Sequence, residues 1–65
     1  MPTELDIFRS AAVLIEHYGK NASAEAADRA ARFYFEGNSE GADVWSAIMA
    51  AVEKIQKTCS DRSAH

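Results

Sequence analysis

Apolar side chains recur along the chain at intervals of three and four residues, and charged side chains fill many of the positions between them. This period is typical of amphipathic helices, and no stretch alternates as a strand would. We therefore predict an all-α fold with helices over about 4–18, 23–36 and 40–58. Because the connecting loops are short, consecutive helices should be antiparallel neighbours, and the expected architecture is a three-helix bundle.

The ends of the first two predicted helices carry recognisable signals. Thr3 is a good N-cap, but Asp6 stands where a capping box has Glu or Gln, so we expect an imperfect box. Gly19 and Gly37 follow the last periodic residues of helices one and two, a position in which glycine ends many helices.

The third predicted helix has the clearest period. Its apolar residues follow an a/d heptad pattern, which comprises Gly41, Trp45, Ile48, Val52, Ile55 and Cys59. The predicted core combines this seam with the inward positions of the other helices: Leu5, Phe8, Ala12, Ile15, Ala27, Ala30, Tyr34, Trp45, Ile48, Val52 and Ile55. Residues 1–59 should form one domain, and the tail 60–65, which has no apolar period, should fray.

Three consecutive aromatic residues precede Gly37, and they point in three directions because helical neighbours are about 100° apart. The charges of helix two centre near Arg29, Arg32 and Glu36, so Tyr34, on the opposite side, is the predicted inward aromatic. Phe33 continues a row of alanines, which makes Phe35 the expected exposed ring. Whether Phe33 or Phe35 is the exposed one stays open, and Phe35 could instead fold over the 37–41 loop.

Small size and a single cysteine favour a protein partner. A chain of 65 residues buries only about 60% of its unfolded surface, and its single cysteine allows no internal disulfide. A second chain is the most natural support, and aromatic side chains are enriched in such contacts. The candidate interface is Phe35 with its neighbours Arg32, Phe33 and Glu36.

The sequence contains no arrangement typical of an active site or a metal site, so we expect no catalytic residues, no cofactor and no small-molecule substrate. Glu16 and His17 are adjacent on a helix and do not face each other, and His17 suits the last helical turn as a cation. Cys59 continues the apolar seam and is expected to be a small buried residue, and the alternative is an intermolecular disulfide if it is exposed. Seven basic and ten acidic residues disfavour nucleic-acid binding. The longest apolar run is too short for a membrane span, and the start lacks the features of a signal peptide, so we expect a cytoplasmic protein.

A resemblance to a known set of proteins rests on spaced residues over 6 to about 55. These are the A-x-L-I of residues 12–15, Gly19, Ala22, Ala26, Arg29-Ala30, Gly37, Gly41, Trp45, Ile48 and Ala51-Val52. The pattern resembles a family of short, uncharacterised helical proteins of alphaproteobacteria. The resemblance implies a bacterial cytoplasmic origin and no catalytic residues. Around 31–36 this chain departs from the family, which has aliphatic residues followed by acidic or small ones. By that comparison Phe33 and Tyr34 occupy core positions and Phe35 replaces a polar surface residue.

Two functional hypotheses follow. The first is a small non-enzymatic interaction or regulatory module that binds a protein partner or a second copy of itself through helix two. The alternative is an acidic inhibitor or nucleic-acid mimic that binds a basic partner, motivated by the net charge of −3.

Overall fold

The computed structural model describes residues 3–63, and the side chains of residues 3–58. Its elements are α1 (Glu4–Tyr18), the 3₁₀ turn η1 (Gly19–Asn21), α2 (Ala22–Phe35) and α3 (Ser39–Ser63). Nearly all of the described residues are helical, and none of them forms a strand. The predicted all-α class is therefore confirmed.

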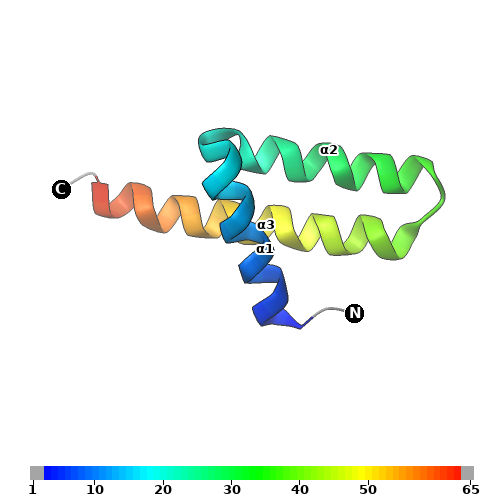
Figure 1. Cartoon of the computed structure of the whole chain (residues 1–65), viewed down its shortest axis with the longest axis horizontal. Helices are drawn as coiled ribbons and strands as arrows, with labels where there is room; N and C mark the ends of the chain where they lie inside the picture. The colour runs from blue at the N-terminus through cyan, green and yellow to red at the C-terminus, as the bar shows by residue number, and fades with distance from the viewer. Residues whose placement is uncertain (1–2, 64–65) are drawn as a thin grey trace.

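Helices α2 and α3 lie side by side and antiparallel, and α1 crosses this pair at a steep angle (Figure 1). Element η1 continues directly from α1 into α2, so the described chain forms two continuous helical stretches, 4–35 and 39–63. The predicted three-helix bundle is accordingly not confirmed. The turn at Gly19 is held against α3, because the Gln56 side chain donates a 2.8 Å hydrogen bond to the Gly19 carbonyl.

The first helix begins at the predicted cap. Thr3 Oγ1 accepts from the Asp6 amide at 3.2 Å, and Asp6 Oδ2 accepts from the Thr3 amide at 3.2 Å. Both bonds of a capping box are present, although the third residue of the helix is an aspartate and not Glu or Gln. The expectation of an imperfect box is therefore wrong, and the shorter carboxylate reaches the cap at the upper end of hydrogen-bond range.

The connection between α2 and α3 satisfies both helix ends with three residues. The amides of Gly37 and Asn38 donate to the carbonyls of Tyr34 and Phe33 at 3.1 and 2.9 Å, which is a Schellman motif. Gly37 has φ +81°, the left-handed conformation that the motif requires. Asn38 also caps α3, because its Oδ1 accepts from the Gly41 amide at 2.9 Å.

Helix α3 is longer than predicted. It continues to Ser63 instead of ending at 58, and residues 60–63 of the expected tail are part of it. No glycine or proline follows Gly41, so nothing in the sequence breaks the backbone hydrogen bonds there. The predicted burial of Cys59 lies outside the described side chains, and residues 64–65 lie outside the described chain.

The core is small and lined by alanine. Its buried residues are Ala11, Leu14, Ala22, Ala26, Ala42, Ile48, Ala51 and Val52, and Val52 is the largest of those described that is fully buried. Larger apolar side chains surround this centre and are partly buried: Ile7, Phe8, Ile15, Val44, Trp45, Met49 and Ile55. Alanine lets the three helices approach closely, but it buries little apolar area per residue.

Several predicted core positions need correction. Leu5 is 59% exposed, because the first turn of α1 extends beyond the edge of α3 (Figure 1). Ala12 is exposed as well, since α1 buries the neighbouring stripe that contains Ala11 and Leu14. Tyr34 is 71% exposed and is not in the core. Ile48 and Val52 are buried as predicted, and Phe8, Ile15, Trp45 and Ile55 pack against the core while partly exposed.

The orientation of α2 explains the error at Tyr34. The ring of Phe33 packs directly on Gly41 of α3, so closely that a Cβ at Gly41 would lie 2.7 Å from Phe33 Cδ1. With Phe33 and the buried Ala22 and Ala26 turned toward α3, Tyr34 is rotated about 100° away from the contact. Helix α2 therefore presents a different face to the core than the position of its charges predicted.

We expect Gly41→Ala to destabilise the protein although alanine is the better helix former. Overpacking against Phe33 should cost about 1–3 kcal/mol, whereas the gain in helix propensity is about 1 kcal/mol. Urea unfolding followed by circular dichroism measures the net loss in the free energy of unfolding. In a Phe33→Ala background the same change should become stabilising. A stabilising effect of Gly41→Ala in the otherwise unchanged chain would contradict the packing of Phe33 on Gly41.

The two leucines of α1 form a matched pair for testing the core. Leu14 is 5% exposed and Leu5 is 59% exposed, so Leu14→Ala should cost about 2–5 kcal/mol and Leu5→Ala much less. Because a domain of this size has only about 3–5 kcal/mol in total, Leu14→Ala should abolish or severely weaken the cooperative thermal transition. Equal losses for both variants would show that α1 buries another face.

Candidate interaction surface

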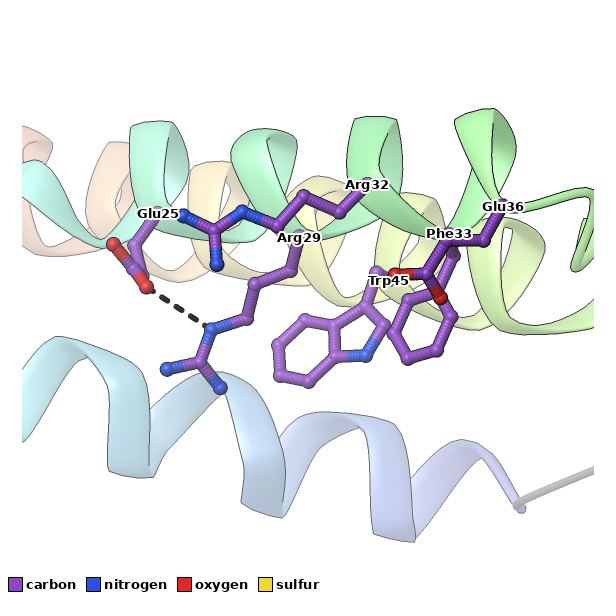
Figure 2. Close-up of a pocket in the computed structure, with 6 residues that line it drawn as sticks. All are labelled: Glu25, Arg29, Arg32, Phe33, Glu36 and Trp45. Atoms are coloured by element: carbon purple, nitrogen blue, oxygen red, sulfur yellow. Dashed lines mark hydrogen bonds and ion pairs between the residues drawn. The ribbon is translucent and has the colours of Figure 1, made fainter.

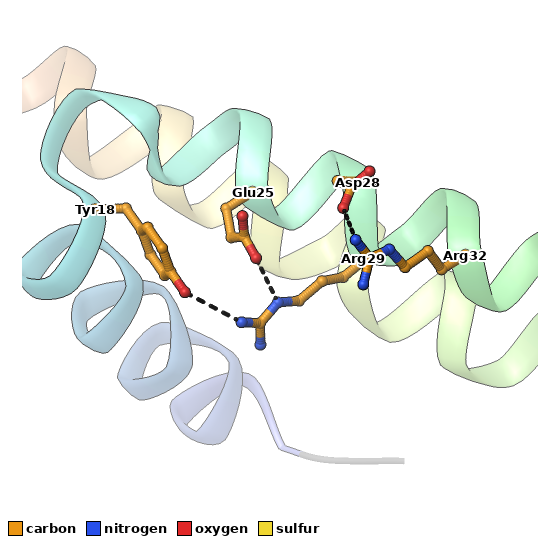
Figure 3. A network of polar contacts seen from close by, with 5 residues as sticks. All are labelled: Tyr18, Glu25, Asp28, Arg29 and Arg32. Carbon is orange, nitrogen blue, oxygen red and sulfur yellow. Dashed lines mark hydrogen bonds and ion pairs between the residues drawn. The ribbon is translucent and has the colours of Figure 1, made fainter.

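Arg29 is the central polar residue between the helices. Its Nε donates to Glu25 Oε1 at 3.0 Å, and its Nη2 lies 3.5 Å from the Tyr18 hydroxyl (Figure 3). The guanidinium carbon also lies 4.9 Å from the centroid of the Trp45 ring, within the range of a cation–π interaction. One side chain of α2 thereby contacts residues of both α1 and α3.

The surroundings favour the charged form of Arg29. The hydrogen bond to Glu25 is the main cause that raises the pKa of Arg29, and the charges of Glu25 and Tyr18 act in the same direction. Desolvation acts in the opposite direction and lowers the pKa, and its influence is second only to the hydrogen bond with Glu25. Arg29 therefore stays cationic at neutral pH, and its guanidinium joins α2 to Tyr18 of α1 and Trp45 of α3.

A groove lies beside Trp45 along the α2–α3 pair. Its main part has a volume of about 350 Å³ and is lined by Glu25, Arg29, Arg32, Phe33, Glu36 and Trp45 (Figure 2). Further hollows adjoin Trp45 on the side of Val13 and on the side of Val44. The rings of Trp45 and Phe33 lie next to each other in this space, and the charged groups lie along its margin (Figure 2).

The main part of this groove offers little chemistry. Among the described residues that line it, none is a serine, cysteine or histidine, and of its two carboxylates, Glu25 and Glu36, the first is bonded to Arg29. The described part of the chain also holds no group of three or more side chains suited to a metal ion. Within residues 3–63, no helix is long and apolar enough to cross a membrane.

The second surface is the outer face of α2, which we define as Ala24, Ala27, Ala31, Tyr34 and Phe35. Ala24 and Ala31 are exposed and Ala27 is half-buried. Tyr34 is 71% and Phe35 86% exposed, and the two rings contact edge to face with centroids 6.1 Å apart. Each ring shields only part of the other from water, because an edge-to-face contact buries a small fraction of the ring area.

Charges flank this face without interrupting it. Arg32 Nη2 lies 3.0 Å from Asp28 Oδ2, and both side chains are largely exposed. Glu25 pairs with Arg29, so both carboxylates of α2 have an arginine partner four residues on (Figure 3). Helix α2 consequently combines internally neutralised charge with an apolar outer face.

The predicted interface residues are divided between two surfaces. Phe35 lies on the outer face of α2 and is exposed, as expected, and it does not fold over the loop. Arg32, Phe33 and Glu36 line the groove along Trp45 instead. The sequence reasoning placed Tyr34 in the core and so missed one of the two exposed aromatics of α2. The spacing of Ala24, Ala27, Ala31 and Tyr34, by three and four residues, is the signal that would have identified this face.

Comparison with models of protein families, with curated proteins and with solved structures finds no match for this chain. The resemblance to an alphaproteobacterial family therefore stays a prediction from the spaced residues.

The two arginine–carboxylate pairs of α2 allow a direct test of the Arg29 cluster. Arg29→Ala should lower the urea midpoint and red-shift the emission of Trp45, the only tryptophan, because the indole loses the guanidinium that covers it. Arg32→Ala removes an exposed pair on the same helix and should change neither quantity appreciably. Matching effects of the two variants would mean that the contact with Trp45 contributes nothing.

Proposed function

We propose that this protein is a small non-enzymatic interaction module, and that it binds its protein partner through the outer face of α2. The exposure of Tyr34 and Phe35 at one end of that face is the observation that supports the proposal. Aromatic side chains are over-represented among the residues that dominate binding energies. Leaving two of them in water on a domain with so small a core forgoes stability that a partner would restore.

The groove along Trp45 is the competing surface, and it fits a partner less well. Its margin is occupied by the Glu25–Arg29 pair, whose charges a partner would have to desolvate or replace. The outer face of α2 carries a smaller cost, since its flanking Asp28–Arg32 pair lies at the edge of the face and the two charges neutralise each other. The acidic-inhibitor alternative gains no support from α2, because both carboxylates of that helix are paired with arginines. The three-helix bundle, the bacterial origin and the cytoplasmic location remain predictions from the sequence.

We expect Phe35→Asp to abolish partner binding while the fold is kept. A residue that is 86% exposed contributes little to folding, so helicity should be unchanged and the free energy of unfolding should stay within about 0.5 kcal/mol. The measurement is affinity capture in the cells that make the protein, with a differently tagged second copy of the chain also present. The expected result is a protein, foreign or identical, that the unchanged chain retains and Phe35→Asp loses.

Val13→Asp is the matched control for this experiment. Val13 is also an exposed apolar residue, but it lies on α1 and lines the groove beside Trp45. It should leave capture intact. Loss of capture with Val13→Asp alone would place the binding surface in the groove, and unchanged capture with both variants would refute an interaction through either surface.

A further inference from the structure

We infer that the partner of the outer face of α2 is a second copy of this chain, paired antiparallel through α2 about a two-fold axis. This inference rests on the proposed function, and it adds the identity of the partner, the direction of the helices and their register. The juxtaposition that carries it is an aromatic pair at one end of the face and small residues at the other.

The outer face has the spacing of a helix–helix seam. Ala24, Ala27, Ala31 and Tyr34 follow one another at intervals of three, four and three residues, which are the a and d positions of a heptad. Phe35 lies beside Tyr34 and makes that end of the seam wide. Ala24, Ala31 and Tyr34 are exposed and Ala27 is half-buried, so most of the seam is available in the folded chain.

A two-fold axis matches the two ends of this seam. In an antiparallel pair, a positions face d positions, so Ala24 would face Tyr34 of the partner subunit and Ala27 would face Ala31 of the partner subunit. Tyr34 and Phe35 then lie on either side of the partner's Ala24, where the absence of a longer side chain leaves room for both rings. The central alanines allow the close backbone approach that brings these ends together.

A parallel pair does not give this match. It would place the aromatic residues of both copies against each other and Ala24 against Ala24 of the partner subunit. The large end would hold the helices apart, and the small end would be left without contact. Shape therefore selects the antiparallel direction, because an isologous interface must be complementary to itself.

The flanking charges agree with the same arrangement. A two-fold axis between antiparallel helices brings the same flank of each helix together. Asp28 and Arg32 lie on that flank, 3.0 Å apart within one copy. In the register above, Arg32 lies beside Asp28 of the partner subunit, so the two ion pairs form a neutral cluster of four alternating charges. This complementarity favours a second copy over a partner with a net charge of its own.

Disulfide trapping tests the register directly. In a Cys59→Ser background, Ala27→Cys and Ala31→Cys are prepared as separate proteins, one of them tagged, and oxidised mildly alone and mixed. The mixture should give a 27–31 disulfide between copies, and each protein alone should give far less, because only facing residues approach within disulfide range. Adding Phe35→Asp to both proteins should suppress the cross-link. Because Ala27 is half-buried, Ala27→Cys could lower helicity. In that case a mixture of Ala24→Cys and Tyr34→Cys proteins tests the same register.

Sedimentation equilibrium of the unchanged chain from about 1 to 200 µM provides the second readout, over a range that spans moderate and weak affinities. A dimer with the mixed cross-link supports the inference. A dimer in which each cysteine protein cross-links mainly to itself means parallel pairing, which overturns the inference and keeps the proposed function. A monomer over the whole range overturns the second copy as partner, and Phe35-dependent capture of another protein then decides the proposed function separately.

Discussion

The packing of Phe33 on Gly41 fixes the structure of this small domain. The ring occupies the space that any larger residue at 41 would need, since a Cβ there would lie 2.7 Å from it. The connection reinforces the contact, because the Phe33 carbonyl accepts from Asn38 and Asn38 in turn caps α3. These contacts set both the axial position and the rotation of α2 against α3, and every other side chain of α2 takes its direction from them.

This rotation of α2 turns a charged side chain inward and two aromatic side chains outward. Inward, it places Arg29 over Trp45, where the side-chain stem packs on apolar surface and the guanidinium keeps its contact with Glu25. Outward, it turns Tyr34 and Phe35 into solvent. The core that remains is lined mainly by alanines, which pack the helices closely but bury little area each. The domain thus uses an arginine for interhelical packing while two of its aromatics lie outside.

The sequence was a good guide wherever structure is decided locally. Thr3, Gly19 and Gly37 mark helix ends within one or two residues of where they occur, because caps depend on neighbouring backbone groups. The rotation of α2 was not predictable in this way, since a charged residue was taken to point outward and Arg29 does not. The exposure of Leu5 depends on the angle at which α1 crosses α3, which no local pattern records. For the same reason only Phe35 of the candidate surface was foreseen, and Tyr34 was missed.

Packing Phe33 on Gly41 leaves Tyr34 and Phe35 exposed on the outer face of α2. This exposure is the physical reason to expect a partner that covers the face. Rotating α2 by about 100° would bury Tyr34, but it would turn Phe33 away from Gly41 and into solvent and would remove Arg29 from Trp45. The chain therefore cannot bury both ends of its aromatic run within one copy. Burying a large apolar side chain is worth about 1.5–3 kcal/mol, a substantial share of the total stability of a domain this small. In the proposed dimer a second α2 would recover that free energy, since the alanines of the outer face are the small surfaces on which the exposed rings would fit.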